Sequence, residues 1–573
     1  MRLVLLLLIT VSCYASGQTI DEFLAAGKSK AAAKDYIGAN ADFTKAIEIN
    51  PKYDVAYIHR GNCKGDLKDY NGAIADFTTA IEINSKSAKA YNNRGVCKAE
   101  LKDLKGAIDD YTKAIEIDPQ YATAYYGRGD SKAKLKDYKG AISDFSKAIA
   151  IDSEFAMAYN NRGVCKAELK NFKGAIDDFN KAIEFDPQSA DAYTSRGLCK
   201  ADLKDYHGAI TDYTKAIEID PQYSLAFYSR GNARLNLEDF DGAIDDYTKA
   251  VDYDPQDAYA YRCRGVCKAF LKDFDEAIAD HTKAIEIDPQ YALAYYCRGD
   301  SRANLKDFQG AIADFSKAVE IDPEYAMAYS NRGFCKAELK DFNGAIADHT
   351  RAIEMNPEDA VVYVNRGNCK AELKDFNGAI QDFTKAIDVN PQYARAYYLR
   401  GDNKSKLEDF KGAIADYTTV IEFDPHDTYA LTSRGRCKAD LNDINGALAD
   451  FTRAIEIEPQ NPVAYNNRGN FRFNLKDVNS AISDYTKAIE INPQFAEAYY
   501  GRGLCKGRLE DFKGAIADYA QAIKINPQNA EAYLERGLLE IAHGSKDKGC
   551  TDLMRARELG STLANDQIVL HCR

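Results

Sequence analysis

The sequence of 573 residues lacks a long apolar run beyond its N-terminal end, and it lacks an excess of basic residues. A membrane-spanning helix needs about 20 predominantly apolar residues in succession, so no transmembrane segment is expected. The formal net charge is −13 at pH 7, and Lys and Arg alternate with Asp and Glu along the chain. Binding to nucleic acid needs clustered Lys and Arg, so a nucleic-acid partner is not expected either.

The sequence also lacks residues in a catalytic or metal-binding arrangement. Its seven histidines form no pair at the spacing of metal ligands on a helix, and its cysteines show no ligand spacing. No glycine-rich loop follows a predicted strand. His281 and His349 stand at positions where similar segments elsewhere in this sequence carry Phe or Tyr. They are therefore expected to be imidazoles packed in the core. The sequence predicts a protein that is not an enzyme and that holds no cofactor or metal.

The first residues differ from the rest of the chain. Arg2 precedes a largely apolar stretch of nine residues, 3–11, and small and polar residues follow at 12–17. This pattern predicts a secretory signal peptide over residues 1–17 and an exported protein that is periplasmic, outer-membrane-associated or extracellular. One alternative is a lipid anchor at Cys13, although Thr10 is unusual in such signals. The other is an uncleaved, buried N-terminal helix.

Glycine recurs every 34 residues from Gly27 to Gly537 without insertion or deletion. With this glycine at position eight, a domain over 18–563 contains sixteen tandem units: 20–53, 54–87, 88–121 and so on to 530–563. In the unit 88–121, apolar and small residues follow steps of three and four along two segments, which predicts two amphipathic helices. Neither helix can bury its apolar face alone, so the units must stack into an elongated solenoid.

The pattern resembles the tetratricopeptide repeat. That repeat has 34 residues, with an aromatic at position four, Gly at eight, Ala at twenty, an aromatic at twenty-four, Ala at twenty-seven and Pro at thirty-two. In the unit 54–87 the matching residues are Tyr57, Gly61, Ala73, Phe77 and Ala80. The resemblance implies an all-α fold, a right-handed superhelical α-solenoid of helix–turn–helix repeats. It also implies a concave groove lined by the first helix of each unit.

Two positions depart from the family pattern. Position seven, usually Leu, is Arg in fifteen units, for example Arg60 and Arg94, and position eleven, usually Tyr, is Lys or Arg in nearly all. Position twenty-three is Asp in every unit, for example Asp76 and Asp110. We expect a ladder of Arg–Asp pairs between the helices, with the aliphatic stems packed inside. The alternative is a charged track for a ligand.

The cysteines fall into two groups. Equivalent positions in neighbouring units lie about 8–10 Å or more apart, whereas a disulfide needs Cα atoms within about 7 Å. Cysteines at position ten are therefore expected to be buried thiols: Cys63, Cys97, Cys165, Cys199, Cys267, Cys335, Cys369, Cys437 and Cys505. Gly560 predicts a turn. Cys550 lies ten residues before this glycine, and Cys572 lies twelve residues after it. An antiparallel hairpin would bring them level, so a disulfide is predicted to pin a C-terminal capping helix over 564–573.

Candidate ligand-binding residues follow from the resemblance, which implies that positions two, five, six, nine, twelve and thirteen of the first helix face the groove. Asn, Tyr and Arg at these positions suit recognition of an extended peptide, although any solvated face needs polar residues. Lys never occupies position five, which disfavours the Lys–Asn clamp that some family members use for a C-terminal carboxylate. The candidates are Asn92, Asn93, Tyr126, Asn160, Asn161, Tyr228, Arg262, Tyr296, Asn331, Asn365, Arg395, Tyr398, Asn466, Asn467 and Tyr500, and Arg436 and acidic residues such as Glu338 stand at these positions as well.

These observations predict an exported, non-catalytic scaffold that binds proteins or extended peptides in the groove. Two other functions stay open at this point. One is a role in assembly of the cell envelope or outer membrane, or in surface attachment, which the N-terminal segment permits. The other is binding or export of a polysaccharide, because Tyr and Asn side chains also suit sugars.

Overall fold

The computed structural model describes residues 19–572, and within that range every regular element is an α-helix and no strand is present. The prediction of an all-α solenoid is confirmed. No helix in this range is long and apolar enough to cross a membrane. The predicted signal peptide over 1–17 and the lipid anchor at Cys13 lie outside the described residues.

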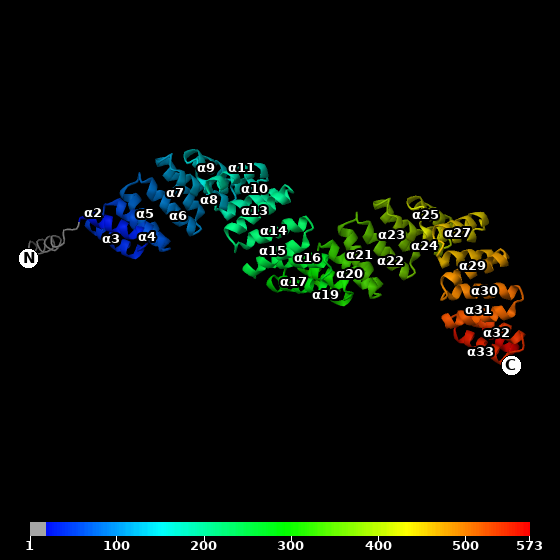
Figure 1. Ribbon diagram of the computed structural model, residues 1–573. Coiled ribbons are helices and arrows are strands. Elements are labelled where there is room, and N and C mark those ends of the chain that lie inside the picture. The colour runs from blue at the N-terminus through cyan, green and yellow to red at the C-terminus, as the bar shows by residue number, and fades with distance from the viewer. Residues whose placement is uncertain (1–18, 573) are drawn as a thin grey trace, which may run out of the picture. The chain divides into compact units, whose positions relative to one another are not determined.

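The described chain forms two compact units, residues 19–289 and 290–572, each built from helical hairpins that follow one another in chain order (Figure 1). The helices of the first unit are α2 (Ile20–Ala32), α3 (Tyr36–Ile49), α4 (Asp54–Asp66), α5 (Tyr70–Ile83), α6 (Ala88–Glu100), α7 (Leu104–Ile117), α8 (Ala122–Lys134), α9 (Tyr138–Ile151), α10 (Ala156–Glu168), α11 (Phe172–Phe185), α12 (Ala190–Asp202), α13 (Tyr206–Ile219), α14 (Ser224–Asn236), α15 (Phe240–Tyr253), α16 (Ala258–Phe270) and α17 (Phe274–Ile287).

The second unit repeats this arrangement and adds one helix at its end. Its helices are α18 (Ala292–Asn304), α19 (Phe308–Ile321), α20 (Ala326–Glu338), α21 (Phe342–Met355), α22 (Ala360–Glu372), α23 (Phe376–Val389), α24 (Ala394–Lys406), α25 (Phe410–Phe423), α26 (Thr428–Asp440), α27 (Ile444–Ile457), α28 (Pro462–Asn474), α29 (Val478–Ile491), α30 (Ala496–Arg508), α31 (Phe512–Ile525), α32 (Ala530–Ala542), α33 (Lys546–Glu558) and α34 (Thr562–His571).

One short turn joins the two helices of each hairpin, as α22 and α23 illustrate. Lys374, just after α22, adopts a left-handed backbone conformation with φ of 63°. Asp375 then caps α23, because its side chain accepts a hydrogen bond from the backbone N–H of Gly378 at 2.9 Å. Such a cap satisfies one of the N–H groups that the first turn of a helix leaves unpaired. The turn fixes the direction in which the second helix returns along the first.

Small residues allow the helices of a hairpin to approach closely. Phe383 of α23 is fully buried against α22. A Cβ atom on Gly367 would lie only 2.7 Å from the Phe383 ring, so glycine is required where these helices meet. The same cluster includes Ala352 of α21 and Ala396 of α24. Over this part of the second compact unit the core therefore continues from one hairpin to the next.

The last helices form a cap of different composition. α34 packs on α33, and Ala564 lies in a cluster with Leu534 and Leu553. Cys550 and Cys572 form a disulfide with an S–S distance of 2.00 Å. Because Cys572 directly follows α34, the disulfide ties the end of this helix to α33.

Candidate functional site

The charged residues that recur in every hairpin bind one another. Arg366 of α22 donates from Nε and Nη2 to the Asp382 carboxylate of α23 at 3.0 and 2.6 Å, and Lys370 lies 2.8 Å from the same carboxylate. The Arg366 guanidinium also lies 5.7 Å from the centre of the Tyr363 ring. Asp382 is only 3% exposed. An anion buried to this degree needs such partners, because burying it unpaired is costly.

Most ladder arginines also contact the preceding hairpin. Arg366 Nη1 donates to the hydroxyl of Thr350 on α21 at 3.0 Å. Fifteen such Arg–Asp ion pairs run from Arg60–Asp76 to Arg536–Asp552. The hydrogen bond to Asp518 raises the pKa of Arg502, so this guanidinium stays charged. The ladder predicted from the sequence is confirmed, and its charges are occupied within the protein.

The predicted groove tyrosines are half-buried beside the core. Tyr126 lies 5.7 Å from the Phe145 ring and 5.0 Å from the Phe155 ring. Tyr228, Tyr296, Tyr398 and Tyr500 approach the equivalent core ring of their own hairpins at 5.6–6.0 Å. Burial raises the pKa of Tyr296 to about 12, so this phenol is neutral near pH 7. The tyrosines are therefore partly exposed and at the same time support the core.

Several predicted groove asparagines bind other protein groups. Asn161 donates to the Tyr126 hydroxyl at 3.1 Å, and Asn331 donates to the Tyr296 hydroxyl at 3.2 Å. Asn93 donates to Asn62 of the neighbouring first helix at 2.8 Å. These bonds connect successive first helices. Part of the predicted recognition set therefore holds neighbouring first helices together.

The remaining candidates differ in their exposure. Asn92 and Asn466 are buried, and their side-chain oxygens, like that of Asn160, have no hydrogen-bond partner. Arg262 donates to the Cys263 sulfur at 2.8 Å, while Arg395 is exposed. Asn365 is partly exposed, and Asn467 lines a hollow along α24, α26 and α28.

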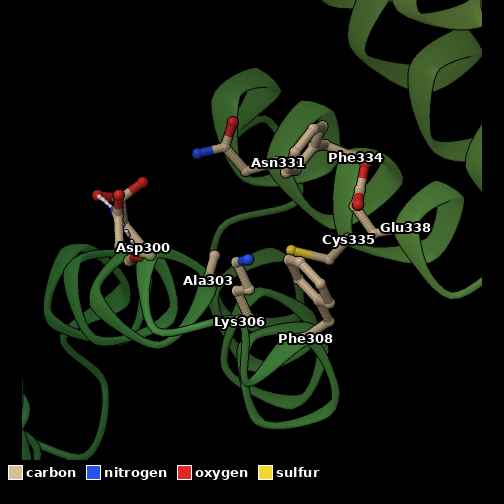
Figure 2. Close-up of a pocket in the computed structure, with 9 residues that line it drawn as sticks. Asp300, Ala303, Lys306, Phe308, Asn331, Phe334, Cys335 and Glu338 are labelled. Carbon is tan, nitrogen blue, oxygen red and sulfur yellow. Dashed lines mark hydrogen bonds between the residues drawn. The ribbon is translucent and has the colours of Figure 1, made fainter. Parts of the chain in front are cut away.

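Several hollows open along the first helices of the second compact unit, and two of them are also lined by a phenylalanine from the start of a second helix. The larger, about 490 Å³, lies between α18 and α20 (Figure 2) and is lined by Asp300, Ala303, Asn304, Lys306, Phe308, Asn331, Phe334, Cys335 and Glu338. The smaller, about 460 Å³, runs along α24, α26 and α28 and is lined by Asp402, Ser405, Lys406, Phe410, Arg436, Ala439, Asp440, Phe451, Asn467, Asn470, Phe471 and Asn474.

Four lining residues of these hollows had been named from the sequence as groove residues, namely Asn331, Glu338, Arg436 and Asn467, whereas most of the others had not. Asp300, Phe334 and Asn470 were not named individually, but all occupy position nine of their units, which the resemblance assigned to the groove and where the sequence varies from unit to unit. Phe308 and Phe410 come from the first turn of the second helix, whereas the predicted groove positions all lie on the first helix. The variability of position nine was a usable signal, whereas the contribution of the second helix required the packed structure.

The position-ten cysteines and two of the histidines are packing residues. All nine position-ten cysteines are buried thiols, as expected, and burial raises the pKa of Cys97 to about 11. His281 and His349 are also fully buried, as expected. Burial lowers the pKa of His349 to about 4, and neither of its ring nitrogens has a hydrogen-bond partner. Between residues 19 and 572, no group of His, Cys, Asp or Glu is placed to hold a metal ion.

Several solved structures are similar to parts of this chain. YrrB, described as a TPR protein with an unusual peptide-binding site, is 28% identical, with a TM-score of 0.30 over 33% of this chain and 97% of its own. MamA is 26% identical, with a TM-score of 0.27 over 29% of this chain and 96% of its own. Yeast Tom70 is 17% identical, with a TM-score of 0.36 over 91% of this chain and 94% of its own. A comparison with curated proteins found no match.

Family models cover most of the chain. Three models, each described as tetratricopeptide repeat, match residues 55–87, 88–121, 122–155, 156–189, 190–223, 228–292, 292–325, 360–393, 394–427, 428–461, 462–495 and 496–529. These matches agree with the helical hairpins that the structure contains. The chain belongs to the tetratricopeptide repeat family, whose fold is typical of non-catalytic protein–protein interaction scaffolds.

Proposed function

We propose that this protein is a non-catalytic scaffold that binds extended peptides, or extended segments of proteins, along the first helices of its hairpins. The observation that carries the proposal is the contrast between two sets of residues. The constant charges pair in the ladder and are occupied, whereas the variable residues of the first helices line open hollows.

The form of the smaller hollow favours an extended ligand. Its lining residues come from three successive first helices, with Asp402 on α24, Arg436 on α26 and Asn470 on α28. A ligand that contacts all three must run across the helices for several residues. A peptide in an extended conformation meets this requirement and presents side chains and backbone groups to polar and aromatic partners in turn.

The test places a photo-crosslinking amino acid at two positions of the full-length protein. One replaces Asp440 on α26, which lines the smaller hollow, and the other replaces Lys385, which lies on the exposed surface of α23. Irradiation in an extract of the source organism should attach a polypeptide at position 440 and much less at position 385. Equal attachment at both positions would refute the groove, and binding of purified protein to a glycan array without any peptide adduct would favour the polysaccharide function.

We further propose that the protein acts outside the reducing cytosol. The disulfide between Cys550 and Cys572 supports this, because structural disulfides persist in oxidising compartments. The buried thiols of the repeats are compatible with such a compartment, since oxidation requires access to the thiolate. Cell fractionation combined with thiol labelling should recover the protein in an exported fraction with this pair linked. Recovery from the cytosol with both thiols reduced would contradict export.

A further inference from the structure

The hollow between α18 and α20 combines an aromatic wall with two carboxylates. Figure 2 shows Asp300 on one side and Phe308, Phe334 and Glu338 on the other. The Phe308 and Phe334 rings lie 6.4 Å apart in an edge-to-face arrangement, and Phe334 is 46% exposed. An exposed phenyl ring beside a carboxylate offers a cation both a π-face and an anionic partner.

The charge of Asp300 is left unbalanced, unlike that of its two counterparts. Asp130 and Asp402 occupy the same position in other units, and each forms an ion pair with the lysine four residues later, at 2.9 Å for Lys134 and 2.8 Å for Lys406. At the larger hollow this residue is Asn304. Its amide donates to the Asp300 backbone oxygen at 2.9 Å and to the carboxylate at 3.4 Å, without supplying a positive charge.

The two hollows consequently differ in charge. The smaller hollow is lined by two acidic residues and two basic ones, Lys406 and Arg436, so it is balanced. The larger is lined by Asp300 and Glu338 with Lys306 as the single basic residue, so it carries one excess negative charge. Burial raises the pKa of Asp300 above its ordinary value, which reflects the cost of holding this carboxylate without a cation. A cationic ligand would remove that cost.

We propose that the larger hollow binds the guanidinium of an arginine side chain in an extended basic peptide. Asp300 and Glu338 supply the negative charge, and Phe334 supplies a face for stacking. A planar guanidinium suits this site because it can stack on a ring while its N–H groups bind a carboxylate. This inference rests on the proposed peptide-binding function and adds the chemistry of the partner.

The test uses the full-length protein and a fluorescein-labelled Gly-Ser peptide that carries four evenly spaced arginines. A matched peptide has citrulline, the uncharged analogue of arginine, at the same four positions. Fluorescence polarisation should show the arginine peptide binding at least tenfold more tightly, because hydrogen bonds between charged groups are the stronger ones. Equal affinity for the two peptides would overturn the inference.

Two variants locate the binding site. Asn304→Lys restores the ion pair that Asp130 and Asp402 make, and those pairs show that the helix accepts lysine there. It should weaken the arginine peptide about tenfold. Asp130→Asn, in the first compact unit (residues 19–289), is the matched control and should change the affinity less than twofold. An unchanged affinity in the Asn304→Lys variant would overturn the inference.

Failure of this inference can be distinguished from failure of the proposed function. If a polypeptide crosslinks to position 440 while the arginine and citrulline peptides bind alike, the groove binds peptides and the arginine site is wrong. If no polypeptide crosslinks preferentially at position 440, the proposed function itself fails.

Discussion

Replacement of Asp382 by alanine is the most direct test of the ladder. In the folded chain its carboxylate accepts two hydrogen bonds from Arg366 and an ion pair from Lys370. The Asp382→Ala variant leaves both cations beside each other without an anion. Their side chains are only 16% and 21% exposed, so water compensates for the loss in part.

The expected cost follows from this geometry. Removing one partner of a buried ion pair costs about 3–5 kcal/mol, and the partial exposure of both cations points to the lower end, about 3 kcal/mol. In a repeat stack each hairpin is held mainly by its neighbours, so the cost should appear locally. Since 1.4 kcal/mol corresponds to a factor of ten, amide hydrogen exchange in α22 and α23 should accelerate about 100-fold.

Hydrogen exchange read by mass spectrometry on the full-length protein measures this effect. The matched control is Asp388→Ala on α23, whose partner Lys385 lies 3.4 Å away in a pair where both side chains are more than half exposed. That control should change local stability by less than about 0.5 kcal/mol. If the amides of α22 and α23 exchange as slowly in the Asp382→Ala variant as in the control variant, the ladder does not stabilise the fold. The double variant with Arg366→Met should recover part of the loss, because it removes one of the two uncompensated cations.

Three further predictions concern packing, pH and redox state. Gly367→Ala would place a methyl group 2.7 Å from a buried phenyl ring and should cost about 1–3 kcal/mol in local hydrogen exchange. Gly507→Ala meets no atom closer than 4.0 Å and should instead stabilise its helix by about 0.5–1 kcal/mol; a similar loss in both variants would contradict the packing argument. Burial lowers the pKa of His349 from 6.5 to about 4. Its neutral form therefore stabilises the fold above pH 6.5, and about 3 kcal/mol of local stability should be lost as the pH falls from 6.5 to 4. His349→Phe should remove this acid loss, and an identical pH dependence of hydrogen exchange in both proteins would refute the assignment. Reduction of Cys550–Cys572 should cost about 3 kcal/mol and expose α33 and α34 to proteolysis while earlier hairpins stay protected; a peptide map with two unlinked thiols before reduction would show that the bond is absent.

The 34-residue repeat of the sequence predicted the hairpins, because each repeated residue makes the same packing contact in its hairpin. Gly367 recurs at its position because a phenyl ring occupies the space of a Cβ atom. Arg366 and Asp382 stand sixteen residues apart, a separation that places them on facing helices. These relations lie within one unit or between neighbours, so a pattern of residue types is enough to reveal them.

The candidate site was predicted less well, because exposure depends on how several units combine. Asn92 stands at a position assigned to the groove, yet it is buried. Tyr126 was expected to contact a ligand, but it also accepts a hydrogen bond from Asn161 of the next unit. Asp300 was not singled out, because it differs from the equivalent aspartates in a neighbouring residue: Asn304 stands where the others have a lysine. That difference becomes meaningful only when the ion pairs of the equivalent aspartates have been seen.

The bond that most ladder arginines make to the preceding hairpin has a consequence for the proposed ligand binding. Arg332 of α20 donates to Ser316 of α19 at 3.2 Å as well as to Asp348 of its own hairpin. Hydrogen bonds weaken steeply when their geometry is distorted, so rotation of one hairpin against the other is opposed. These hairpins form the two sides of the hollow that contains Asp300. The proposed binding site is thus preorganised, and if it binds a peptide, the entropy cost of ordering on association falls mainly on that peptide.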